Sequence, residues 1–311
     1  MGDHQTETGA DEKNGGDGHP LSPPIDRERR RTVKGRPPES HGMYDRIVLG
    51  VDGSEAANRA ANAGLAVAAL FDAEVSVVTV VESGLLDRTA DAAEDDRLRE
   101  AARDVLDEVV ADAEARGLSV SGEVLEGNPA DRIADFAGDW AADLVVLGRQ
   151  GHTGLGERIL GSTTESVVHY SDVPVLVIPE GGTTLDADLD RVLLPTDGSE
   201  NAERAVPHAG TVAERTGATV AAVSVLDVQT AAGPFGAGGL EPSFVDRLER
   251  ESEAALDRVT DRLAESYPDV AVTTDLVRST SFSGVAPVLA DYVADHDVDL
   301  VVLGSHGRSN L

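Results

Sequence analysis

The chain has 311 residues, of which 41% are hydrophobic, enough for two domains of ordinary size with buried cores. It carries 57 acidic residues against 26 lysines and arginines, a formal net charge of -31, and no cysteine. The absence of cysteine excludes disulfides, thiol nucleophiles and cysteine-based zinc sites, and the charge argues against direct nucleic-acid binding. No apolar run could span a membrane and no signal peptide is evident, so we expect a cytoplasmic protein with no membrane partner.

The acidic residues are scattered along the chain rather than gathered in runs. At about 1 M salt the Debye length falls to roughly 3 Å, which screens the repulsion that so much like charge creates. We therefore expect a halophilic cytoplasm. The alternative, an acidic surface that binds a basic partner, predicts clustered acidic runs.

Both lysines of the chain, Lys13 and Lys34, precede residue 35. The remainder of the chain therefore has no lysine for a Walker A motif or a Schiff base.

Residues 1–42 are rich in glycine, proline and charge, which predicts a disordered N-terminal extension. Met43 stands directly before the first apolar strand, so the extension could also be an upstream start-site artefact. A second alternative is that the basic stretch from Arg27 to Arg36 docks on acidic surfaces.

Short apolar runs alternate with helical stretches through residues 43–180, which we expect to form the first domain. This alternation predicts an α/β fold with an open parallel sheet, and the uninterrupted apolar runs are typical of strands buried on both faces. Gly117 and Pro129 mark a helix end and a helix start. The expected strands are 46–51, 74–81, 119–125, 143–147 and 173–178, and the expected helices are 54–70, 90–116, 129–141 and 162–170.

The sequence repeats itself after a linker at residues 181–190. Residues 46–60 match 191–205, and residues 142–151 match 298–307, so residues 191–311 form a second copy of the domain. Leu311 aligns with Leu155, and counterparts of Gly156 to Pro179 are therefore absent. Either the second domain lacks its last helix and last strand, as we expect, or the chain has been cut short.

A glycine pattern follows the fourth expected strand: Gly148 and Gly151, then Gly161 and Ser162 at the start of a helix. Glycines let backbone N–H groups approach a phosphate, and a helix N-terminus adds free donors and a positive dipole end. In open α/β sheets ligands bind beyond the carboxyl ends of strands. Asp52 ends the first strand at the same edge, where it could accept a hydrogen bond from a ribose or adenine donor.

Structural alternatives exist for each of these residues. A glycine pair after a strand is often only a turn, Asp52 could be a capping carboxylate, and Ser54 is expected to cap a helix rather than bind a ligand. His152 and His306 have no second ligand at metal spacing, which favours structural or solvent roles over a metal site. No catalytic residue and no metal ligand is predicted.

The spacing of the four glycines and serine, together with the Asp-Gly-Ser turn after the first strand, resembles the universal stress protein family, in particular its ATP-binding members. The resemblance covers residues 44–179 fully and 191–311 in part. It implies two tandem Rossmann-like domains, similar to the adenine nucleotide α-hydrolase fold, with strand order 3-2-1-4-5. It also implies an adenine-nucleotide site in repeat 1 formed by Gly50, Val51, Asp52, Val80, Gly148, Gly151, Gly161, Ser162 and Thr163. The second, incomplete site comprises Pro195, Thr196, Asp197, Val225, Gly304 and Gly307.

The resemblance predicts a stress-response protein that binds ATP, or alternatively AMP, with magnesium as an accompanying ion. We expect it to signal through its conformation, with an unknown protein partner and a homodimer as a further expectation. The alternatives are a slow ATPase or phosphotransferase and an interaction scaffold that binds no nucleotide.

Overall fold

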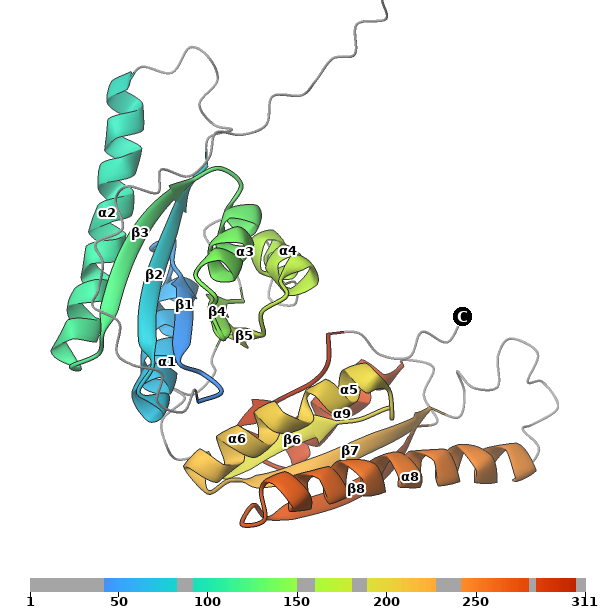
Figure 1. Cartoon of the computed structure of the whole chain (residues 1–311). Coiled ribbons are helices and arrows are strands. Elements are labelled where there is room, and N and C mark those ends of the chain that lie inside the picture. The colour runs from blue at the N-terminus through green and yellow to red at the C-terminus, as the bar shows by residue number, and fades with distance from the viewer. Residues whose placement is uncertain are drawn as a thin grey trace, which may run out of the picture. The chain divides into compact units, whose positions relative to one another are not determined.

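The structure, a computed structural model, describes residues 42–82, 92–149, 160–180, 189–227, 242–279 and 284–305. The expected extension at residues 1–42, apart from Gly42, and most of the expected linker at 181–190 lie outside these ranges. Both repeats are α/β units built on parallel sheets (Figure 1).

Repeat 1 contains a five-stranded parallel sheet in the order β3-β2-β1-β4-β5, as the family resemblance implied. Its strands are β1 (Arg46–Gly50), β2 (Glu74–Val81), β3 (Val120–Glu126), β4 (Leu144–Gly148) and β5 (Val175–Ile178). Its helices are α1 (Glu55–Phe71), α2 (Ala92–Ala115), α3 (Pro129–Asp139) and α4 (Ser162–Tyr170). The expected helix at 162–170 is confirmed residue for residue.

The helices of repeat 1 cover its sheet on two faces, and each face has its own apolar core. Residues of α1 and α2 pack with one set of strand residues, including Leu49 and Val77. Residues of α3 and α4 pack with the other set, including Val48 and Val78. Alternate residues of β1 and β2 thus serve opposite cores, as the period of a strand requires.

As the sequence indicated, a glycine follows the end of α2 and a proline begins α3. Gly117, just beyond α2, has φ +78, a left-handed conformation that glycine adopts without strain. Pro129 is the first residue of α3, whose preceding residue Asn128 accepts hydrogen bonds from the amides of Ala130 and Asp131 at 3.0 and 3.3 Å.

Repeat 2 contains a four-stranded parallel sheet in the order β8-β7-β6-β9, which matches the first four positions of the sheet in repeat 1. Its strands are β6 (Arg191–Pro195), β7 (Thr219–Asp227), β8 (Val272–Ser279) and β9 (Leu300–Val301). Its helices are α5 (Glu200–Arg204), α6 (Val206–Thr216), α8 (Pro242–Ser266) and α9 (Val285–Asp295). Within the described ranges no strand pairs with the outer edge of β9.

The edge strands differ from the expectation of strands buried on both faces. Residues Ser121 to Glu123 of β3 are exposed, and so are Thr273 to Asp275 of β8. Each strand ends its sheet, with a neighbour on one side only. Burial on both faces holds for the inner strands β1, β2 and β4.

Candidate functional site

The candidate site of repeat 1 lies at the carboxyl ends of β1 and β4, which are paired in parallel register from Ile47↔Leu144 to Leu49↔Val146. The chain runs outward from β1 through β2 to β3 on one side and continues through β4 to β5 on the other. The β1/β4 boundary is therefore the point where the strand order reverses, and a crevice for ligands forms beyond the carboxyl ends of such strands.

Asp52 and Ser54 form a capping turn at the end of β1. The Ser54 amide donates to Asp52 Oδ1 at 3.0 Å, and Ser54 Oγ accepts from the Ala57 amide at 3.1 Å. Ser54 is thus the N-cap of α1, as expected. The Asp52 side chain remains exposed at the carboxyl edge of the sheet while one of its oxygens orders the turn.

Gly148 is required where β4 passes the start of α1. A Cβ atom on Gly148 would lie 2.7 Å from the carbonyl carbon and oxygen of Ala56, closer than real Cβ contacts. Backbone atoms cannot move away as the end of a flexible side chain can. The sequence predicts a glycine here for the close approach of a phosphate, and the structure shows that strand-to-helix packing also requires one.

Helix α4 begins at the carboxyl end of β4 without a side-chain cap. Its N-cap residue is Gly161, in extended conformation with φ -61 and ψ 144, and Ser162 is its first helical residue. The Gly161 amide donates to the Arg149 carbonyl at 2.7 Å. The first amides of a helix need acceptors, and no side chain of the cap supplies one here.

Thr164 fixes α4 to β4 and was not singled out from the sequence. Its Oγ1 donates to the Gly148 carbonyl at 2.8 Å, and the residue is 5% exposed. No sequence signal distinguishes it from its exposed neighbour Ser162 or half-buried Thr163, because its role depends on the tertiary position of β4.

The remaining residues expected in the first site differ in accessibility. Gly50 faces the Leu147 side chain, and Val51 is 5% exposed within the core between α1 and the sheet, so neither presents a side chain to the carboxyl edge. Val80 is half-buried and packs against the core beneath α3 and α4. Gly151 and His152 lie outside the described residues.

Repeat 2 reproduces the turn at the end of its first strand. The Ser199 amide donates to Asp197 Oδ1 at 2.9 Å, and Ser199 Oγ accepts from the Ala202 amide at 3.1 Å. Thr196 is buried, and its Oγ1 accepts from the Gly198 amide.

The structure also places Pro195, Val225 and Gly304 of the second expected site. Pro195 ends β6, and Val225 packs in a small core with Val277. A Cβ on Gly304 would lie 2.5 Å from the Asn201 carbonyl oxygen, the same close approach as at Gly148. Gly307 and His306 lie outside the described residues.

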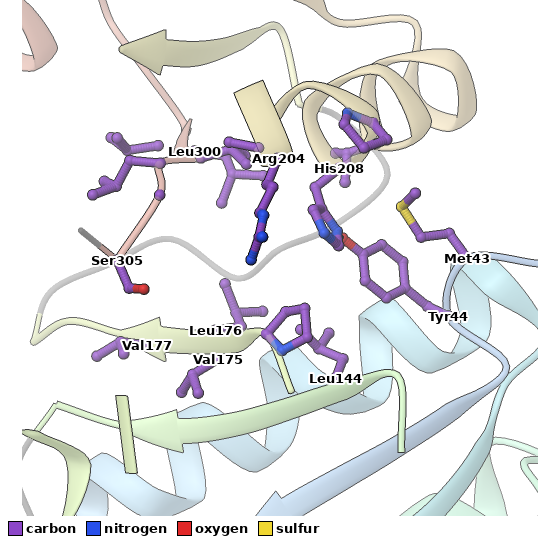
Figure 2. Close-up of a pocket in the computed structure, with 18 of the residues that line it drawn as sticks. Met43, Tyr44, Leu144, Val175, Leu176, Val177, Arg204, His208, Leu300 and Ser305 are labelled. Atoms are coloured by element: carbon purple, nitrogen blue, oxygen red, sulfur yellow. The ribbon is translucent and has the colours of Figure 1, made fainter. Parts of the chain in front are cut away.

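A pocket elsewhere is lined by β5 residues Val175 to Val177 and by residues of repeat 2 that include Arg204, Leu300 and Ser305 (Figure 2). Asp52, Gly148, Gly161 and Ser162 do not line it. It is therefore a feature separate from the candidate site of repeat 1, although Gly304 does contribute to it.

Tyr44 and His208 also line this pocket and contact each other (Figure 2). Tyr44 Oη and His208 Nδ1 are 2.7 Å apart. Burial raises the pKa of the Tyr44 hydroxyl and lowers the pKa of His208. Both shifts favour the neutral forms, in which the hydroxyl donates to the imidazole nitrogen.

The described part of the chain shows neither a metal-binding cluster nor a membrane-spanning helix. It contains no group of three or more His, Cys, Asp or Glu side chains arranged to hold a metal ion. None of its helices combines the length and apolar character needed to cross a membrane.

Comparisons with known proteins agree with the duplicated fold. The profile of the universal stress protein family matches residues 43–179 and 189–311. A universal stress protein of Mycobacterium tuberculosis is 31% identical over 292 residues, which is 89% of this chain and 90% of that protein. One from Methanocaldococcus jannaschii is 37% identical over 140 residues, 44% of this chain and 82% of its own length. The crystal structure of a universal stress protein from Archaeoglobus fulgidus has a TM-score of 0.61 and 21% identity over 83% of this chain and 86% of that chain, a likeness of fold. The chain belongs to the universal stress protein family.

Proposed function

We propose that repeat 1 binds an adenine nucleotide, ATP or alternatively AMP, and that the protein uses this binding in a stress response. The phosphates would lie at the N-terminus of α4, and Asp52 would accept a hydrogen bond from the ribose or the base. The observation that carries the proposal is the start of α4 at the carboxyl end of β4, with Gly161 as a cap that supplies no side-chain acceptor. Amides at such a helix start are donors for a phosphate, and the helix dipole favours its negative charge.

The residues around α4 suit a phosphate. Ser162 is exposed and Thr163 half-exposed in the first turn, so both can present hydroxyl donors beside the backbone amides. Thr164 holds this turn against the end of β4. We expect magnesium to arrive bound to the triphosphate, because no metal-binding cluster is found among the described residues.

The two repeats are proposed to differ in affinity. Repeat 2 keeps the aspartate turn and Gly304, but its described residues contain no counterpart of α4 after β9. One chain should therefore bind one nucleotide tightly. We further propose that the protein works in a salt-rich cytoplasm, since the charge of -31 favours solvation at high salt over binding to nucleic acid or membrane.

Isothermal titration calorimetry of the intact chain with ATP and with AMP, at molar KCl, tests the proposal. We expect one tight site and a loss of at least tenfold in affinity, about 1.4 kcal/mol, for Gly161→Val, whose side chain would block close backbone approach. Gly307→Val in repeat 2 is the matched control and should bind as the parent does. Thermal unfolding of each variant separates lost binding from lost folding.

Several outcomes would contradict parts of the proposal. Two equivalent sites per chain, or normal binding by Gly161→Val, would refute the assignment to α4. Failure of the parent to bind ATP and AMP, or to retain a nucleotide detectable by mass spectrometry on purification, would leave the scaffold alternative. Magnesium-dependent phosphate release above a blank would instead favour a slow ATPase or phosphotransferase.

A further inference from the structure

Arg132, in the first turn of α3, has a guanidinium nitrogen with no acceptor. Its Nε is buried and makes no hydrogen bond within the part of the chain that the structure describes. Its Nη1 lies 4.0 Å from Asp135 Oδ2, at the limit of an ion pair, and the side chain is 30% exposed. A buried donor without a partner is costly and uncommon in native proteins, so an acceptor from outside the chain is a natural candidate.

The Arg132 side chain lies near the carboxyl edge of the sheet, where β3 ends. Its Cγ would lie 3.1 Å from a Cβ on Gly127, which directly follows β3 and has φ +134. The Gly127 amide donates to the Val81 carbonyl at 3.0 Å, which joins the ends of β3 and β2. The stem of Arg132 therefore covers the β2/β3 end of the edge that carries Asp52 and α4.

A nucleotide held by its phosphates at α4 can reach this end. Adjacent strands are about 4.8 Å apart, so the β2/β3 boundary is roughly 12 Å from β4, across β1. Asp52 stands between them at the end of β1. The extent of a nucleotide from phosphates to base is of the same order, and a molecule that passes Asp52 from α4 brings its base to the ends of β2 and β3. Val80 and its cross-strand partner Leu125 supply an apolar surface there, on the α3 side.

We propose that Arg132 is a positioning residue that donates a hydrogen bond from Nε to a ring nitrogen of the purine base; this rests on the proposed function. Purine ring nitrogens are acceptors, and a guanidinium is a donor only. Arg99 of α2 differs from Arg132 in this respect. Its Nε already donates to Oε1 of Glu126, the last residue of β3, at 2.7 Å. Repeat 2 has Val288 at the position of Arg132 in the aligned helix α9, and so lacks this donor.

Calorimetry with ATP and, separately, with inorganic triphosphate tests the assignment in the intact chain. We expect Arg132→Ala and Arg132→Gln each to weaken ATP binding about tenfold and to leave triphosphate binding unchanged. Arg99→Ala, the matched control, should leave both unchanged. Melting temperatures show whether either Arg132 variant has lost its fold, and Arg132→Gln retains most of the packing over Gly127.

The outcomes distinguish this inference from the proposed function. If the parent binds ATP and both Arg132 variants bind it equally well, the role of Arg132 is refuted and the nucleotide site stands. Equal weakening of ATP and triphosphate binding would assign Arg132 to the phosphates and also overturn the inference. If the parent binds no nucleotide, the proposed function fails, and the inference fails with it.

Discussion

At the scale of single residues, the sequence predicts well those roles that depend on near neighbours. Ser54 and Ser199 each cap a helix three residues from the amide they accept, and Asp52 and Asp197 each order the same turn. Contacts between residues far apart in the sequence cannot be predicted in this way. Tyr44 and His208 are 164 positions apart, and no local pattern indicates that they meet.

The pH dependence of stability should carry a contribution from His208. Burial lowers its pKa in the folded state, so the unfolded chain binds the proton more readily. Stability from the neutral imidazole is present above the ordinary pKa of about 6.5 and is lost as pH falls below it. His208→Gln, which keeps a side-chain acceptor for Tyr44, should flatten the fall in Tm between about pH 7.5 and 5.5. Parallel Tm curves for parent and variant would contradict this contribution.

At the scale of elements, alternating apolar runs and capping signals predict the strands and helices of repeat 1 almost completely, whereas the strand order followed from the family resemblance. The boundaries of β2 and α4 agree residue for residue, and those of the other elements differ by one or two residues. The exposed face of β3 could not be predicted in the same way, because burial of a strand depends on its place in the sheet. The close approach of α1 to Gly148 likewise depends on how strand and helix meet in space.

Substitution of the two strand-end glycines tests this helix approach. Gly148→Ala and Gly304→Ala should each destabilise the protein by about 1–3 kcal/mol, because the added methyl group meets helix backbone. Gly138→Ala in α3, where a Cβ would have nothing within 4 Å, is the control and should be neutral or stabilising. The measurement is thermal unfolding without nucleotide. Loss of ATP binding by Gly148→Ala at unchanged Tm would show instead that this glycine serves only the ligand.

At the scale of the whole molecule, the two repeats have similar folds, and we propose that their sites are unequal. Both repeats keep the aspartate turn and a glycine at or shortly after the end of their fourth strand. The described residues provide an α4 in repeat 1 alone, and the unpartnered Arg132 Nε has no counterpart at Val288. The glycine spacing on which the proposed site depends can be read from the sequence. The unsatisfied donor, Arg132 Nε, could not be predicted from the sequence, because its burial depends on how the side chain packs in the folded protein.

The net charge of -31 should make stability depend on salt, and helix α2 illustrates the physical reason. Glu100, Asp104 and Glu108 are exposed at successive four-residue intervals on this helix. Like charges at this spacing repel by a few tenths of a kcal/mol per pair, and salt screens the repulsion. We expect Tm to fall sharply when KCl is lowered from about 2 M to about 0.1 M, where the Debye length rises to roughly 10 Å. The triple variant Glu100→Gln/Asp104→Asn/Glu108→Gln should show a smaller fall in Tm on this change than the parent.

Glycerol in place of KCl controls for effects of solutes that do not screen charge. A Tm that is independent of KCl would refute the salt-adapted interpretation, whereas equal protection by glycerol would assign the effect to hydration rather than to charge.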